Sequence, residues 1–185
     1  KELAQEKFGD IPFVEYKPSP NPNKNAYFGD LHVHTENSFD AYTFGTTSSP
    51  AVSYEFAKGK AIKHPTGYAI QLSRPLDFYA VTDHGVFMGI VKEAADTSSE
   101  VSKYELAKPL HNLNENVSGN IISILRRANT FRPFARSLAT GIEEGIIDMD
   151  LLLEVSSGVW QRTVEAADQA YVPGKFTTFA AYEYT

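Results

Sequence analysis

One short segment constrains the fold of this chain more than any other. Residues 76–82 read Leu-Asp-Phe-Tyr-Ala-Val-Thr, a run that is mostly apolar and rich in residues that favour β-structure. A short apolar run of this kind is typical of a strand covered on both faces. Such strands belong to parallel sheets, in which neighbouring strands are joined by crossover helices. The segment therefore predicts an α/β fold.

Two further segments are expected to join this sheet. Residues 27–34 predict a short buried strand with Phe28, Leu31 and Val33 as its apolar members, and residues 175–185 are again apolar and strand-like. Other elements are expected between the first two strands. They are a loop over 35–49, a helix from Ser49-Pro50 to about Lys58 that stops at Gly59, and a turn with a short strand or ribbon over 60–75.

Residues 86–172 are expected to be helical nearly throughout. Helix-forming residues cluster around 91–96, 99–108 and 120–128, with Pro109 and Pro133 as breaks. A longer helix, capped by Asp148 or Asp150, is expected to reach Tyr171. Its apolar residues recur at three- and four-residue spacing and predict one buried face: Val155, Val159, Trp160, Val164, Ala167 and Tyr171. This helical block forms a long insertion within a domain over 27–185, preceded by an extended Pro-rich arm over 1–26.

Composition narrows the functional classes. Lys+Arg 17 and Asp+Glu 23 give a formal net charge of −6, which counts against nucleic acid as a partner because phosphate contacts need a basic face. No apolar run approaches the roughly 20 residues that span a bilayer, so no membrane partner is expected. The chain has no Cys, which excludes thiolate catalysis and Cys-ligated zinc. Any bound metal must be held by nitrogen and oxygen.

The two ends of the sequence suggest a piece of a longer polypeptide. The first residue is Lys1 rather than Met, and the strand-like last segment stops at Thr185. We therefore expect the remainder of the chain to follow Thr185. A missing start is compatible with an exported mature protein, so a periplasmic or secreted location is slightly favoured.

The residues that carry chemistry lie at the ends of the three expected strands. His32 and His34 are two apart on a strand, so both imidazoles point to the same face and can converge on one ion. His84 follows the second strand and Glu183 lies near the end of the third. The carboxyl ends of strands hold the active site in α/β folds. The alternative interpretation of His32 and His34 is a hydrogen-bonded pair near the surface, because short motifs of this kind also occur without a metal.

Other polar residues have less specific interpretations. Asp40 follows His34 by six residues, so its loop can fold back onto the ion, and Asp83 is expected to orient a ligand or a backbone group. Asp30 is expected to be structural, and His64 and His111 to lie in a loop and at a helix end. Arg74, with the lysines at 58, 60 and 63, is a candidate for binding an anionic substrate, with a solvated basic loop as the alternative.

At these residues the sequence resembles the polymerase-and-histidinol-phosphatase (PHP) superfamily of metal-dependent hydrolases. The His-x-His of the first strand, the Thr82-Asp83-His84 of the second and the Glu of the third follow its motifs in order. More narrowly, three segments resemble a PHP-related family catalogued as a domain of unknown function (DUF3604): residues 27–35, 72–78 and 182–185. The resemblance spans about residues 27–185 apart from the helical block.

This resemblance implies a distorted TIM-like (β/α) barrel of PHP type, of which this sequence holds the N-terminal part. The strand ends of such a barrel hold two or three divalent metal ions, with Mn, Zn, Fe and Mg all admissible. Carried over by position, His32, His34, Asp40 and His84 are terminal ligands, and Glu183 matches the carboxylate that bridges two ions. The later histidines and the Asp-x-His near the end of such a barrel are not found, because the sequence stops at Thr185.

The implied activity is hydrolysis by a metal-activated water, with a small anionic phosphate ester as the expected substrate. Clustered divalent ions lower the pKa of a water and neutralise charge on a phosphoryl oxygen. Two alternatives stay open at this point. One is an amidohydrolase-like hydrolase of C–N or carboxyl-ester bonds. The other is a non-catalytic module in which metal braces the fold.

Overall fold

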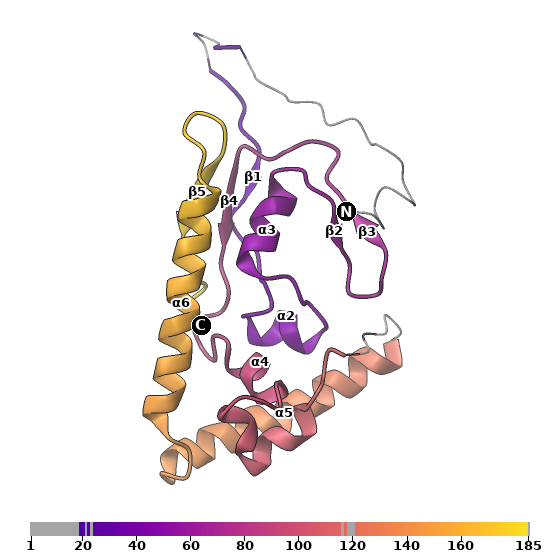
Figure 1. Ribbon diagram of the computed structural model, residues 1–185, viewed down its shortest axis with the longest axis vertical. Coiled ribbons are helices and arrows are strands. Elements are labelled where there is room, and N and C mark those ends of the chain that lie inside the picture. The colour runs from indigo at the N-terminus through magenta and orange to yellow at the C-terminus, as the bar shows by residue number, and fades with distance from the viewer. Residues whose placement is uncertain (1–18, 21, 23, 116, 118–120, 185) are drawn as a thin grey trace.

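Three short parallel strands form the central sheet of the computed structural model, which describes residues 19, 20, 22, 24–115, 117 and 121–184 (Figure 1). The strands are β1 (Gly29–Asp30), β4 (Phe78–Val81) and β5 (Thr177–Ala180), in the order β1-β4-β5. Phe78 pairs with Gly29 on one side and with Thr177 on the other. The predicted α/β class is confirmed. The strands in the described part of the chain form no closed barrel.

Two helices lie against one side of this sheet. Helix α3 (Pro50–Ala57) precedes β4 and helix α6 (Met149–Ala170) precedes β5, so each occupies the crossover position of a β–α–β unit (Figure 1). Both helices meet the same face of β4 in one apolar cluster, whose buried members are Tyr54, Ala57, Tyr79, Val81, Ala166, Ala167, Ala170 and Phe176. Because Tyr79 and Val81 are two residues apart on a strand, they point to the same side. This cluster is the core beneath the sheet.

Helix α3 begins and ends as its sequence predicts. The Ser49 hydroxyl accepts a hydrogen bond from the Val52 N–H, Pro50 occupies the first turn, and Gly59 has a positive φ of 85° just after the helix. The predicted ribbon is also present. Strands β2 (Ile62–Lys63) and β3 (Ala69–Ile70) pair antiparallel beside the main sheet.

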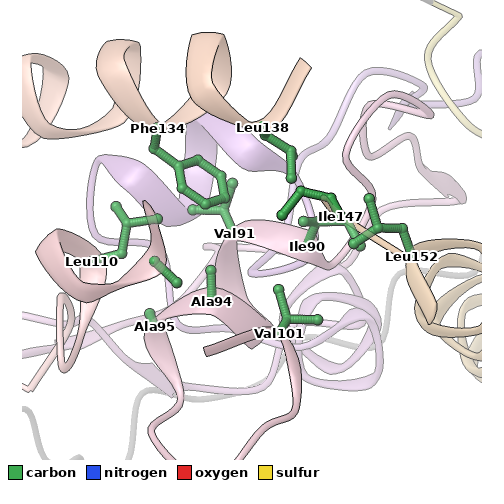
Figure 2. Close-up of a cluster of buried hydrophobic side chains, with 11 residues drawn as sticks. Ile90, Val91, Ala94, Ala95, Val101, Leu110, Phe134, Leu138, Ile147 and Leu152 are labelled. Atoms are coloured by element: carbon green, nitrogen blue, oxygen red, sulfur yellow. The ribbon is translucent and has the colours of Figure 1, made fainter. Parts of the chain in front are cut away.

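The helical block has its own core, at the lower end of the molecule in Figure 1. It contains α4 (Ile90–Ala95), the 3-10 helices η1 (Val101–Lys103) and η2 (Glu105–Leu110), and α5 (Ile121–Glu143). Figure 2 shows side chains from α4, α5 and the start of α6 meeting in one cluster. Helix α6 therefore contributes to both cores, with Leu152 in this one and Ala166 in the one beneath the sheet.

Several details of the helical block differ from the sequence prediction. The segment 99–108 forms η1 and η2 instead of one α-helix, because Tyr104 between them is extended and its hydroxyl accepts a hydrogen bond from the Asp148 N–H. Pro133 does not break α5. Proline removes one helical hydrogen bond, yet α5 continues because Phe134 and Leu138, which follow it, are buried in the core.

The start of α6 is as predicted, since the Asp148 carboxylate accepts from the Asp150 N–H. On its apolar face, Val159 and Ala167 are buried, whereas Tyr171 ends the helix and is half-exposed. In the part of the chain that is described, no helix combines the length and apolar character needed to cross a membrane. The arm expected over 1–26 falls mostly outside the described residues.

A short helix, α2 (Phe39–Thr43), lies where a loop was predicted over 35–49. Its amino end, Ser38, is extended and makes no side-chain cap, so local sequence signals for this helix are weak. Tertiary contacts hold it instead. Thr43 is buried, and the Asn114 side chain donates to the carbonyl of Tyr42. This helix supplies two residues of the site described next.

Candidate metal centre

The three chain segments that carry the predicted ligands meet at the carboxyl ends of the strands. Beyond β1, the backbone N–H of Thr82 donates to the carbonyl of Val33 over 2.7 Å. Beyond β5, Glu183 forms a parallel bridge with His84, in which its N–H donates to the carbonyl of Asp83. The parallel pairing of the sheet thus extends past its named strands and brings both segments alongside His84.

Three imidazoles surround one oxygen of Glu183. The Nε2 atom of His34 lies 2.8 Å from Oε2 of Glu183, the Nε2 atom of His32 lies 3.3 Å away, and the Nδ1 atom of His84 lies 3.5 Å away. The Nε2 atom of His34 is buried and has no hydrogen-bond partner among the described residues. Nitrogen and carboxylate oxygen atoms gathered in this way could hold a divalent cation.

Asp40 lies on the other side of the same histidines. Its Oδ2 atom is 3.0 Å from Nδ1 of His34 and 3.6 Å from Nε2 of His84. The Ser38 hydroxyl and the Ala41 N–H donate to the Asp40 carboxylate, each over 2.6 Å. Burial raises the pKa of Asp40, but these hydrogen bonds and the nearby His34 outweigh it and hold the pKa below its ordinary value. Asp40 is therefore a carboxylate at neutral pH.

Two overlapping groups of three residues could each hold an ion: His32 with His34 and Glu183, and His34 with Asp40 and His84. Within each group the donor atoms lie within 4.8 Å of one another. His34 is common to both groups, with its Nδ1 atom near Asp40 and its Nε2 atom near Glu183. A neutral imidazole has a single free lone pair. His34 can therefore ligate one ion, while its other nitrogen donates a proton to a carboxylate.

Asp83 does not reach this cluster directly. Its carboxylate accepts from the Thr35 N–H over 2.5 Å and from the Thr35 hydroxyl over 2.7 Å. Burial raises the pKa of Asp83, and the two hydrogen bonds from Thr35 lower it in part. Because Thr35 directly follows His34, Asp83 anchors the backbone that carries the histidine.

The site is open to solvent on the side of His32. The His32 side chain is 71% exposed, whereas those of His34 and His84 are 14% and 12% exposed. A small molecule would therefore approach the cluster past His32. The Glu183 side chain, 31% exposed, is intermediate between His32 and the other two histidines in its exposure.

Other predicted site residues are not brought to this cluster. Arg74 precedes β4, at the end opposite His84, where its guanidinium lies 4.3 Å from the centre of the Phe28 ring. Lys58 and Lys60 form ion pairs with Glu55. Lys63 lies on β2. His64 and His111 were not expected in the site: His64 forms a hydrogen bond with Thr66 in an exposed turn, and His111 directly follows η2, with its Nε2 atom 3.1 Å from the carbonyl oxygen of Ser102.

Two residues of the site were missed in the sequence. Ser38 donates to Asp40, accepts a hydrogen bond from the His84 N–H over 3.3 Å, and lies 3.3 Å from Nδ1 of His34. Phe39 stacks on the His84 ring with 4.5 Å between centroids. The sequence signal for both is their position directly before Asp40, in a segment whose small polar residues are typical of a loop. Asp30, expected to be structural, accepts from the His32 N–H.

Comparison with known proteins gives one family. The family described as Protein of unknown function (DUF3604) matches residues 21–185. This range contains every residue of both candidate metal-binding groups. No curated protein and no solved structure matches the chain.

Proposed function

The chain belongs to the family described as Protein of unknown function (DUF3604), and we propose that it acts as a metal-dependent hydrolase on phosphate esters. One observation carries this proposal. Three imidazole nitrogens lie within 3.5 Å of a single oxygen of Glu183, in a cluster whose solvent side is marked by the exposed His32. Such a cluster can hold cations and still leave room for a substrate.

The mixture of nitrogen and oxygen donors in the cluster fits several divalent cations. Imidazole nitrogens suit Zn and Fe, and carboxylate oxygens suit Mn and Mg. We propose that His32, His34 and Glu183 hold one ion, and that Asp40 and His84 contribute to a second. Two or three ions in all would agree with the PHP resemblance. When bound, such ions lower the pKa of a coordinated water and neutralise charge that develops on the substrate.

The protein's own residues have separate tasks in this proposal. Asp40 accepts the Nδ1 proton of His34, which directs the Nε2 lone pair toward His32 and Glu183. Ser38 donates to Asp40 and so fixes the carboxylate in that orientation. Asp83 holds Thr35 and therefore the backbone next to His34. The solvent side at His32 admits the substrate, which we propose to be a small anionic molecule.

We also propose that the sheet is part of a distorted TIM-like barrel of PHP type. The strand order β1-β4-β5 follows the chain, and both α3 and α6 contact the same face of β4. Sequential strands with helices on one side are the arrangement found in β/α barrels. The further strands of such a barrel are not among the described residues.

The proposal is tested with protein stripped of metal and reloaded with Mn²⁺, Zn²⁺, Fe²⁺ or Mg²⁺. Phosphomonoesters, phosphodiesters and carboxyl esters are then compared with and without chelator. We expect phosphoester turnover that requires metal and is abolished when His32 and His34 are both replaced by Ala. His64→Ala is the matched control, because His64 lies in an exposed turn outside the cluster, and it should keep full activity.

Three results would contradict the proposal in different ways. Turnover restricted to carboxyl esters or C–N bonds would indicate an amidohydrolase-like reaction. Tightly bound metal without turnover of any substrate would indicate a non-catalytic, metal-braced module. Full phosphoester activity in the double variant would exclude His32 and His34 from the reaction.

A further inference from the structure

The ring of Phe39 lies between two other rings in a stacked column. On one face is the imidazole of His84, with centroids 4.5 Å apart and planes inclined by 21°. On the other face is Phe131, with centroids 5.2 Å apart and planes inclined by only 8°. The column therefore runs without interruption from a candidate metal ligand to the middle of helix α5.

The far end of the column is anchored in the helical core. Phe131 packs against the buried cluster that includes Phe134 and Leu138 of the same helix. Phe39, at the start of α2, packs against this cluster too and is followed directly by Asp40. The helical block is thus in contact with the candidate metal centre, although it was expected only as an insertion between strands.

A fourth ring closes the edge of the column. Phe87 meets Phe39 edge-on, with centroids 6.3 Å apart and planes inclined by 82°. Its backbone has a φ of 55°, a left-handed conformation that is uncommon for a bulky residue. Residues in such conformations persist only where their surroundings hold them. The loop after His84 therefore places the Phe87 ring against Phe39.

We infer that Phe39 and Phe131 are positioning residues for His84, through which the helical block sets the geometry of the metal centre. Aromatic pairs of this kind contribute about 0.5–1.5 kcal/mol beyond the area they bury. A flat ring on each side of Phe39 limits how far the His84 ring can rotate, so its nitrogens keep their directions toward Asp40 and Glu183. The inference rests on the proposed function in taking His84 as a metal ligand.

The test compares Phe→Leu substitutions of stacked rings in the column with a Phe→Leu substitution of a neighbouring ring that is not stacked. Phe39→Leu and Phe131→Leu keep an apolar side chain but remove a stacked ring. Phe134→Leu is the matched control: Phe134 lies on α5 in the same core and is tilted by 41° to Phe131 rather than stacked on it. Phe131→Tyr restores a ring at the same position. Affinity for Co²⁺ and Zn²⁺, the visible spectrum of bound Co²⁺ and the thermal midpoint of metal-free protein are measured for each variant.

We expect Phe39→Leu to weaken metal affinity by about tenfold, the usual lower limit for loss of a group that orients a ligand. Phe131→Leu should weaken it less, in the same direction, and both should alter the Co²⁺ spectrum. Phe131→Tyr should return affinity to the wild-type value. Phe134→Leu should lower the thermal midpoint and leave affinity unchanged. Equal affinity losses in Phe131→Leu and Phe134→Leu, after similar losses of stability, would overturn the inference.

A measurement without metal separates this inference from the proposed function. In metal-free protein, the ring-proton NMR resonances of His84 should move downfield in Phe39→Leu and change in Phe131→Leu, but not in Phe134→Leu. Unchanged His84 resonances in the first two variants would overturn the inference. If the two variants show these shifts but the wild-type protein binds no metal, the proposed function fails and the positioning of His84 stands.

Discussion

The Nε2 atom of His34 lies 2.8 Å from Oε2 of Glu183, although the two residues come from opposite ends of the chain. The parallel sheet accounts for this proximity. Both flanking segments pair with the chain that follows β4, Val33 with Thr82 and Glu183 with His84. A carboxylate and a buried imidazole are thereby held at the open end of the sheet.

The two central histidines should differ in importance. The His34 ring is nearly buried and lies near two carboxylates, Asp40 and Glu183, whereas the His32 ring is exposed and forms an ion pair only with Glu183. Water can replace an exposed ligand more readily than a buried one. We therefore expect His34→Ala to weaken metal affinity at least about tenfold more than His32→Ala, measured by competition with a chelating dye. Equal losses would show that the two positions are equivalent.

Loss of the Asp83 carboxylate should destabilise the folded protein even when no metal is bound. Asp83→Ala would leave the buried Thr35 N–H without an acceptor, which costs about 1–3 kcal/mol in the free energy of unfolding. Urea unfolding of metal-free protein measures this loss. Thr35→Val removes only the hydroxyl donor and should cost less. A fully stable Asp83→Ala protein would show that the backbone at Thr35 is held in another way.

Two glycine substitutions should act in opposite directions. A Cβ atom at Gly29 would overlap the carbonyl oxygen and ring of Phe78, so Gly29→Ala should separate β1 from β4 and lower both stability and metal affinity. A Cβ atom at Gly158, inside α6, would meet only the flexible end of Arg162. Gly158→Ala should therefore raise stability by about 0.5–1 kcal/mol through helix propensity. Thermal unfolding of both variants checks the prediction, which fails if Gly29→Ala is harmless.

Buried tyrosines beneath the sheet should make the protein sensitive to alkali. Burial raises the pKa of Tyr54 and of Tyr79 above the ordinary value of 10.0. The native state holds the protons of these hydroxyls more tightly, so the groups ionise at a lower pH in the unfolded chain than in the native state. Their contribution to stability is complete below pH 10 and is lost as the pH rises through the folded-state pKa. The free energy of unfolding, followed from pH 8 to 11, should fall, and less steeply in Tyr54→Phe. An unchanged slope in that variant would contradict the assignment.

The convergence of His32, His34, His84 and Glu183 could be predicted from the sequence, because each follows an apolar segment with the character of a parallel strand. Parallel strands end at the same edge of a sheet, so their polar successors lie together. The cap of α6 at Asp148 could be predicted for a similarly local reason. These features depend on short stretches of chain.

The rest depends on contacts between distant residues. Helix α2 has no capping side chain, and the path of α5 through Pro133 is held by burial of the residues after it. The stack of His84 on Phe39 and of Phe39 on Phe131 joins three separate segments. No periodicity in any one segment signals such a column. The charge of Arg74 fits an anionic substrate, but charge alone does not indicate that Arg74 lies at the end of β4 opposite His84.

The most direct test of the account is the position of a bound ion. Crystals of the protein grown with Zn²⁺ or Mn²⁺ and measured at the absorption edge of the metal locate it by anomalous scattering. We predict a peak about 2.0–2.2 Å from Nε2 of His34 and from a carboxylate oxygen of Glu183, with His32 completing the site. The account would be contradicted if saturating metal gave no anomalous peak at the cluster, or if the ion bound only elsewhere on the chain.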